Sequence, residues 1–193
     1  MVVRFLWMTY GKYEHVDAAA YGMFWSRRDW LWVHLAGGTV GMLLGFTQFL
    51  TRLRVRHPVV HRWTGRIYLL AMLVACIGAT GLIATSPAGL GIRVAFAATG
   101  LAWLVAALMG FVAIRRKRIQ AHRRWMVRAY IVNFAPILFR TLILVPGVMT
   151  LASPVLMIPT LLWLSWAAPI ILFDLGSIAL RAVRGSERTA LAY

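Results

Sequence analysis

The residues whose side chains could best bind a ligand or a cofactor lie in a short motif that the sequence contains twice. Residues 61–68 read HRWTGRIY and residues 122–130 read HRRWMVRAY, so each copy joins a His-Arg pair to the pattern W-x-x-R-x-Y. Two neutral imidazoles at one level of a helix bundle can ligate a haem iron, and nearby arginines can pair with the haem propionates. The motif therefore predicts a site for a b-type haem. The candidate residues of this site are His61, His122, Arg66 and Arg128.

Other interpretations of the repeated motif remain open. Its histidines and arginines could hold the phosphate of an anionic lipid or a similar headgroup, because arginine forms bidentate bonds with phosphate. Its Trp, Tyr and Arg residues could instead anchor two helix ends at the membrane surface, which leaves only the two histidines unexplained. The protein would then be a structural or accessory subunit of a membrane complex without chemistry of its own. No spacing identifies a reaction: His57 and His61 are four residues apart, but no HExxH motif surrounds them.

Further polar residues stand within apolar stretches, where such residues are costly and often functional. Since an α-helix turns by about 100° per residue, His122, Asn133 and Arg140 lie within about 40° of one line. Together with His34 they predict a polar seam that lines a cavity. A plainer alternative is a structural arginine beside a kink at Pro136.

Asp174 is the only acidic residue between residues 30 and 181. An isolated carboxylate inside a membrane should either pair with a basic residue or be protonated. The candidate partners are Arg66, Arg128 and a protonated histidine of the repeated motif. Asp174 is therefore a candidate for a salt bridge or for proton handling.

The composition indicates a membrane protein. Of the 193 residues, 61% are hydrophobic and only 13% are charged, and the mean hydropathy is +0.75. Soluble domains carry about 25% charged residues. Several apolar runs are long enough to cross a bilayer, which needs about 20 residues per helix, so we expect an all-α, polytopic transmembrane helix bundle. The five predicted spans are 30–51, 65–86, 92–114, 125–146 and 155–180.

The basic residues predict the orientation of this bundle. The net charge is +16, and fifteen of the 21 Lys and Arg residues fall within 52–66, 115–128 and 181–188. Each cluster follows a predicted span, whereas the connectors 86–91 and 146–154 carry no charge. Under the positive-inside rule, this pattern predicts a membrane bundle with a cytoplasmic carboxyl terminus. It argues against nucleic acid as a partner, and it makes membrane lipids and other membrane subunits the expected partners.

The spans divide the chain into three segments. We expect residues 1–29 to be extracytoplasmic, residues 30–181 to form the bundle and residues 182–193 to form a cytoplasmic tail. Within the bundle, each copy of the motif follows a basic loop and begins a span that runs from the inside to the outside. The first two spans are therefore related to the next two by a two-helix parallel repeat.

Three stretches of the chain resemble a known family. They read HLAGGTVGMLLGFTQFL, RVRHPVVHRWTGRIYLL and RRKRIQAHRRWMVRAYIVNFAPILFR, and they lie within residues 30–145. They resemble the bacterial multi-pass membrane family catalogued as domain of unknown function 2306. The resemblance implies a helical fold and a location in the bacterial cytoplasmic (inner) membrane, but no activity, because the family is itself uncharacterised. Members usually begin with another hydrophobic span, so the resemblance also implies that residues 1–29 hold the remnant of a further span.

Overall fold

The computed structural model describes the backbone of residues 2–190 and the side chains of residues 2–183. Within these residues the chain is helical and contains no strand, which confirms the predicted all-α fold. The elements are α1 (Val2–Gly11), α2 (Ala18–Tyr21), the 3-10 helix η1 (Gly22–Arg27), α3 (Arg28–Thr47), α4 (Thr51–Arg56), α5 (Pro58–Ala84), α6 (Leu90–Arg115), α7 (Ile119–Ile143), the 3-10 helix η2 (Val148–Thr150), α8 (Pro154–Leu164) and α9 (Ala167–Ala190).

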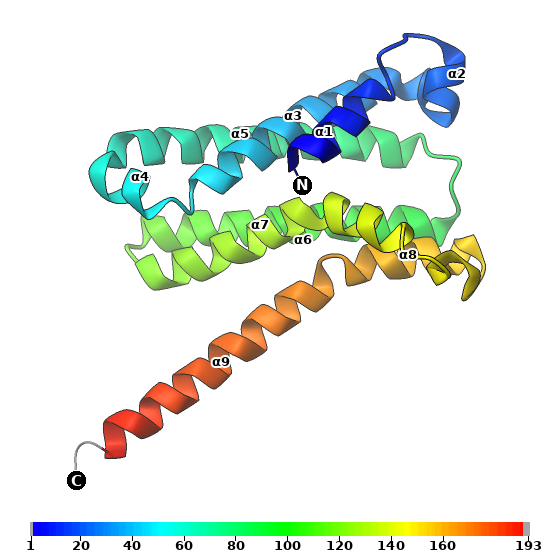
Figure 1. Cartoon of the computed structure of the whole chain (residues 1–193). Helices are drawn as coiled ribbons and strands as arrows, with labels where there is room; N and C mark the ends of the chain where they lie inside the picture. The colour runs from blue at the N-terminus through cyan, green and yellow to red at the C-terminus, as the bar shows by residue number, and fades with distance from the viewer. Residues whose placement is uncertain (1, 191–193) are drawn as a thin grey trace.

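Four long helices form the body of the molecule as two antiparallel hairpins (Figure 1). In the first hairpin α3 packs along α5, and in the second α6 packs along α7. The hairpins meet where α5 contacts α6 and where α3 contacts α7. α8 then packs on α6 and α7, whereas α9 leaves the other helices at an angle. α5 and α7 therefore run in the same direction, as the predicted parallel repeat requires.

Among the described residues, five helical segments are long and apolar enough to cross a membrane, which confirms the predicted number of spans. They are Ala18–Thr47, Pro58–Ala84, Leu90–Arg115, Ile119–Ile143 and Pro154–Val183. α5 and α7 begin seven and six residues before the predicted starts at 65 and 125. These first turns are basic and carry the histidines of the repeated motif. The helices therefore begin before the predicted spans, because hydropathy marks the apolar residues and not the first helical turn.

The fifth span is a pair of helices rather than one. α8 ends at Leu164 and α9 begins at Ala167. Pro169 has no backbone N–H, and its ring crowds the carbonyl four residues earlier, which belongs to Ser165. The buried Ser165 hydroxyl donates to the carbonyl oxygen of Leu162 at 2.6 Å. The break lets α9 take a direction of its own.

α9 also continues past residue 180, where the fifth span was predicted to end. It extends to Ala190, so the predicted tail at 182–193 is helical where the structure describes it. Residues 191–193 lie outside the described residues.

Glycines allow the first hairpin to pack closely. A Cβ at Gly37 would lie 2.5 Å from the backbone nitrogen of Ala75 and 2.6 Å from the carbonyl oxygen of Ala71. A Cβ at Gly78 would collide with the backbone of His34 on the opposite helix. Small residues let helix backbones approach in this way within lipid. The contact between α3 and α5 therefore requires glycine at both positions.

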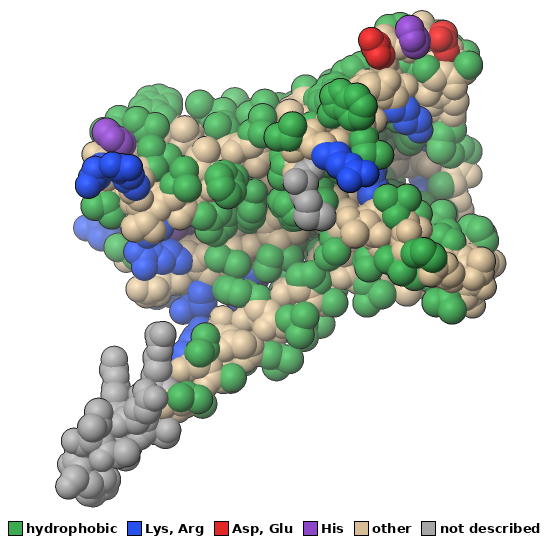
Figure 2. All heavy atoms as spheres, viewed as in Figure 1, with side chains coloured by type: hydrophobic (Ala, Val, Ile, Leu, Met, Phe, Trp, Pro, Cys, Tyr) green, Lys and Arg blue, Asp and Glu red, His purple; other side chains and the backbone are tan. Residues whose placement is uncertain are grey.

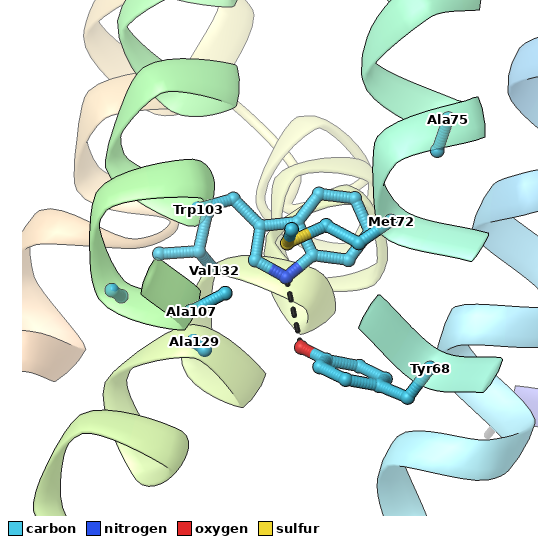
Figure 3. Packing of buried hydrophobic residues seen from close by; sticks show 8 residues of the cluster. Tyr68, Met72, Ala75, Trp103, Ala107, Ala129 and Val132 are labelled. Atoms are coloured by element: carbon cyan, nitrogen blue, oxygen red, sulfur yellow. Dashed lines mark hydrogen bonds between the residues drawn. The ribbon is translucent and has the colours of Figure 1, made fainter. Parts of the chain in front are cut away.

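The main core lies between α5, α6 and α7 (Figure 3). Tyr68 and Met72 of α5 face Trp103 of α6, and Ala129 and Val132 of α7 complete the cluster. Tyr68 is 1% exposed, and its hydroxyl oxygen accepts a hydrogen bond from Nε1 of Trp103 at 2.9 Å. This bond supplies the partner that a buried indole N–H requires. One tyrosine of the repeated motif is therefore a core residue rather than a surface anchor.

The segment before α3 packs against the bundle. The hydroxyl of Tyr10 in α1 lies 2.7 Å from Oγ1 of Thr39 and 3.4 Å from the carbonyl oxygen of Leu35, both in α3. Arg27 of η1 is 5% exposed and donates to the carbonyl oxygen of Thr85, just after α5, at 3.1 Å. α1 therefore lies beside a membrane-spanning helix, and η1 is attached to the end of another.

Candidate functional site

Most basic residues lie at one end of the bundle, which we call the basic end. It consists of residues 51–66 and 115–128, that is, α4, the starts of α5 and α7, and the turn after α6. Twelve of the 21 Lys and Arg residues lie in these two segments, which contain no acidic residue. Figure 2 shows Lys and Arg side chains gathered at this end and acidic side chains at the far end, beside α2. The basic end is therefore strongly positive.

The two copies of the repeated motif form the same local contact. The Arg66 guanidinium lies 4.8 Å from the centre of the Trp63 ring, and the Arg128 guanidinium lies 4.6 Å from the centre of the Trp125 ring. Each is a cation–π pair between residues three apart, which are neighbours on a helix surface. The repeat in the sequence is therefore also a repeat in local structure.

Beyond this contact the two copies differ. Arg66 is exposed. Arg128 forms a bidentate ion pair with Asp174 of α9, with Nη2 2.6 Å from Oδ1 and Nε 3.2 Å from Oδ2. The Arg128 guanidinium also lies 5.8 Å from the centre of the Phe173 ring. Of the candidate partners for Asp174, the structure therefore selects Arg128.

Two of the candidate histidines bond to the backbone of a neighbouring helix. Nδ1 of His122 in α7 lies 2.9 Å from the carbonyl oxygen of Gly110 in α6. Nδ1 of His34 in α3 lies 2.9 Å from the carbonyl oxygen of Ala75 in α5. Because a carbonyl oxygen only accepts, each Nδ1 carries the hydrogen and donates it. Both histidines therefore join two antiparallel helices.

His61, in the first turn of α5, lacks such a bond. Its side chain is half-buried, and its Nδ1 is buried without a hydrogen-bond partner among the described residues. Three basic residues act on it: Arg54 of α4, His122 of α7 and the adjacent Arg62. Arg54 is absent from the predicted site, because in the sequence it is one of many arginines and only the turn between α4 and α5 brings it to His61. The structure thus brings His61 and His122 near one another and adds Arg54 to them.

This arrangement does not favour a haem. Ligand pockets for molecules of that size occupy about 300 Å³ or more. A cavity between α3, α5 and α7 holds about 10 Å³ and is lined by residues that include Gln48, Tyr68 and Tyr130. A single water molecule already needs about that volume. The arginine of α7 that was predicted to pair with a propionate is bonded to the carboxylate of α9 instead.

The predicted polar seam is not one continuous site. Asn133 is 4% exposed at the centre of the bundle, and its Nδ2 has no partner among the described residues. Arg140 faces α1, where it donates to Oγ1 of Thr9 at 2.5 Å and lies 4.6 Å from the centre of the Phe5 ring. Thr9 is 131 residues away from Arg140, so no local pattern could predict this contact. His34, Asn133 and Arg140 therefore occupy three separate environments. Within the described part of the chain, no group of three or more His, Cys, Asp or Glu side chains could hold a metal ion.

Comparison with known proteins supports the membrane location. The family model described as "Predicted membrane protein (DUF2306)" matches residues 31–176. The chain belongs to this family. No curated protein and no solved structure matches it. Membership of DUF2306 agrees with the multi-pass helix bundle and specifies no activity, so the function must be argued from the geometry of the basic end.

Proposed function

We propose that this DUF2306 protein binds an anionic, phosphate-bearing group at its basic end. The site consists of Arg54, His61, Arg62 and His122, which come from α4, α5 and α7. The observation that carries the proposal is the buried Nδ1 of His61, which has no partner among the described residues although three basic groups act on the ring. An anion supplies both the missing acceptor and the missing negative charge.

The electrostatics of the basic end support the same proposal. Its two segments hold twelve Lys and Arg residues and no acidic residue that could balance them. An arginine near a membrane surface contributes about 1 kcal/mol to the attraction of an anionic lipid. Two arginines therefore contribute about 2 kcal/mol, which corresponds to about 30-fold in affinity. Anionic phospholipid headgroups and soluble phosphate compounds share this chemistry.

The test is a matched pair of double variants. Arg54→Ala with Arg62→Ala removes two groups that act on His61. The control, Arg52→Ala with Arg56→Ala, removes the same charge from exposed positions in the same region. The probes are phosphatidylglycerol, followed by native mass spectrometry of the purified protein, and inorganic phosphate, followed by titration calorimetry.

We expect the first double variant to weaken binding by about 30-fold and the control by less than about threefold. An effect confined to phosphatidylglycerol identifies a lipid ligand, and an effect on phosphate identifies a soluble one. Equal losses in both variants, or no binding of either probe to the unmodified protein, would contradict the proposal and favour a structural or accessory role.

We propose further that the basic end faces the cytoplasm of a bacterial inner membrane. Loops rich in Lys and Arg are retained on that side, and α9 runs toward the basic end (Figure 1). In a Cys76→Ala background, a cysteine at Arg116 should react with a membrane-impermeant maleimide only after the cells are permeabilised. A cysteine at Ser153, in the turn at the opposite end, should react in intact cells. The reverse labelling pattern would rule out this orientation.

A further inference from the structure

Among the described side chains, one ion pair joins α9 to α7, and α9 leaves the bundle beyond it. Asp174 binds Arg128 of α7, and Phe173 lies against the same guanidinium. Residues 178–182 are all exposed. Figures 1 and 2 show α9 running away from the bundle as it approaches the basic end. The two helices therefore border a wedge, closed at the ion pair and open toward the basic end, which we call the α7–α9 wedge.

Both sides of the α7–α9 wedge carry an arginine. On α7, Arg124 is one turn nearer the basic end than Arg128 and about 40° away around the helix. On α9, Arg181 is two turns nearer the basic end than Asp174 and about 20° away around the helix. Arg124 is half-buried, Arg181 is exposed, and neither forms an ion pair with a described side chain. Since Asp174 is already neutralised by Arg128, no acidic side chain among the described residues balances these two arginines.

The remaining surface of α9 beside the wedge is apolar. Leu175 and Ile178 are 58% and 61% exposed, and both lie on the helix within the membrane-spanning segment. Apolar side chains at this depth contact acyl chains. An arginine pair at the headgroup level next to an apolar helix surface complements both parts of a phospholipid.

We infer that the α7–α9 wedge holds one anionic phospholipid, with its phosphate between Arg124 and Arg181. The inference does not depend on the site at His61: the two sites share α7, but neither Arg124 nor Arg181 belongs to that site. Charge selects the occupant: an anionic headgroup balances the arginines, whereas a zwitterionic one balances them only in part. A second copy of the chain docked on this wedge by two-fold symmetry would bring the same arginines and repel.

The test measures lipid binding to the full chain by native mass spectrometry. It is made in the Arg54→Ala, Arg62→Ala background, so that failure of this inference and failure of the proposed function are distinguishable. The probes are phosphatidylglycerol and phosphatidylcholine at equal concentration. The test variant is Arg124→Gln with Arg181→Gln. Its matched control, Arg115→Gln with Arg116→Gln, removes the same charge from exposed positions at the end of α6.

We expect the test variant to lose about 30-fold in phosphatidylglycerol binding, and the control to stay within about threefold. Phosphatidylcholine should bind more weakly and respond to neither variant. Arg181→Gln alone, at an exposed position that packing does not constrain, should lose about fivefold and serves if the double variant does not fold. Equal losses in the two double variants, equal binding of the two lipids, or a dimer without bound lipid would overturn the inference.

Discussion

Replacement of Gly37 by alanine should loosen the first hairpin. A Cβ at this position would lie 2.5 Å from the Ala75 nitrogen and 2.6 Å from the Ala71 oxygen. Both are backbone atoms within α5, so no side-chain rotation relieves the contact. An ordinary contact begins at 3.4 Å. α3 and α5 must therefore separate locally by about 0.9 Å, which forfeits about a quarter to a half of the dispersion energy of each contact that opens.

Two opposing contributions determine the net change in the free energy of unfolding. Alanine stabilises a helix by about 1 kcal/mol relative to glycine, and overpacking a close interface costs about 1–3 kcal/mol. The matched control is Gly38→Ala on the same helix, where a Cβ would meet nothing within 4 Å. The control keeps the helix contribution without the clash. We therefore expect Gly37→Ala to be less stable than Gly38→Ala by about 1–3 kcal/mol.

The assay is thermal unfolding of the detergent-purified protein, followed by tryptophan fluorescence. For a chain of this size, 1 kcal/mol corresponds to about 2–4 °C in Tm, so Gly37→Ala should melt about 2–12 °C below Gly38→Ala. Equal Tm values for the two variants, or a higher value for Gly37→Ala, would refute the close approach of α3 to α5.

Two further predictions concern tyrosines. Tyr68→Phe should cost about 1–3 kcal/mol, because it leaves the buried Nε1 of Trp103 without an acceptor. Tyr130→Phe, the equivalent change in the second motif, should cost less than about 0.5 kcal/mol, because its hydroxyl bonds to no described residue; similar Tm losses would contradict this difference. Burial raises the pKa of Tyr13 above its usual 10.0, although the charge of Arg140 opposes the shift. Since a raised pKa favours the protonated folded state, this stabilisation is complete below pH 10.0 and is lost as the pH rises through the folded-state pKa. Tyr13→Phe should therefore reduce the alkaline fall in Tm, and an unchanged profile would count against the burial of Tyr13.

The repeated motif shows which contacts the local sequence can predict and which it cannot. The pairs Trp63–Arg66 and Trp125–Arg128 are three residues apart on a helix, so their contact follows from spacing alone. The different surroundings of the two copies do not follow from spacing. Tyr68 is a core residue because α6 lies against it, and no pattern within the motif distinguishes it from its counterpart.

The differences between the predicted spans and the observed helices have a physical cause as well. Hydropathy measures how well a segment partitions into lipid, and it does not report where backbone hydrogen bonding begins. The basic first turns of α5 and α7 are therefore helical but were left out of the predicted spans. The break between α8 and α9 lies in a continuously apolar stretch, and its one visible signal is Pro169.

The class of protein, the number of spans and the concentration of positive charge at one end follow from the sequence by itself. These properties depend on the composition of each segment, because a chain in lipid must bury its apolar side chains and pair its backbone groups within each helix. The tertiary structure decided which polar groups meet: Asp174 with Arg128, Arg140 with Thr9, and His61 with Arg54. Hydrogen bonds and ion pairs act over a few ångströms, so their partners depend on which helix faces pack together, and that choice is made by contacts between residues far apart in the chain.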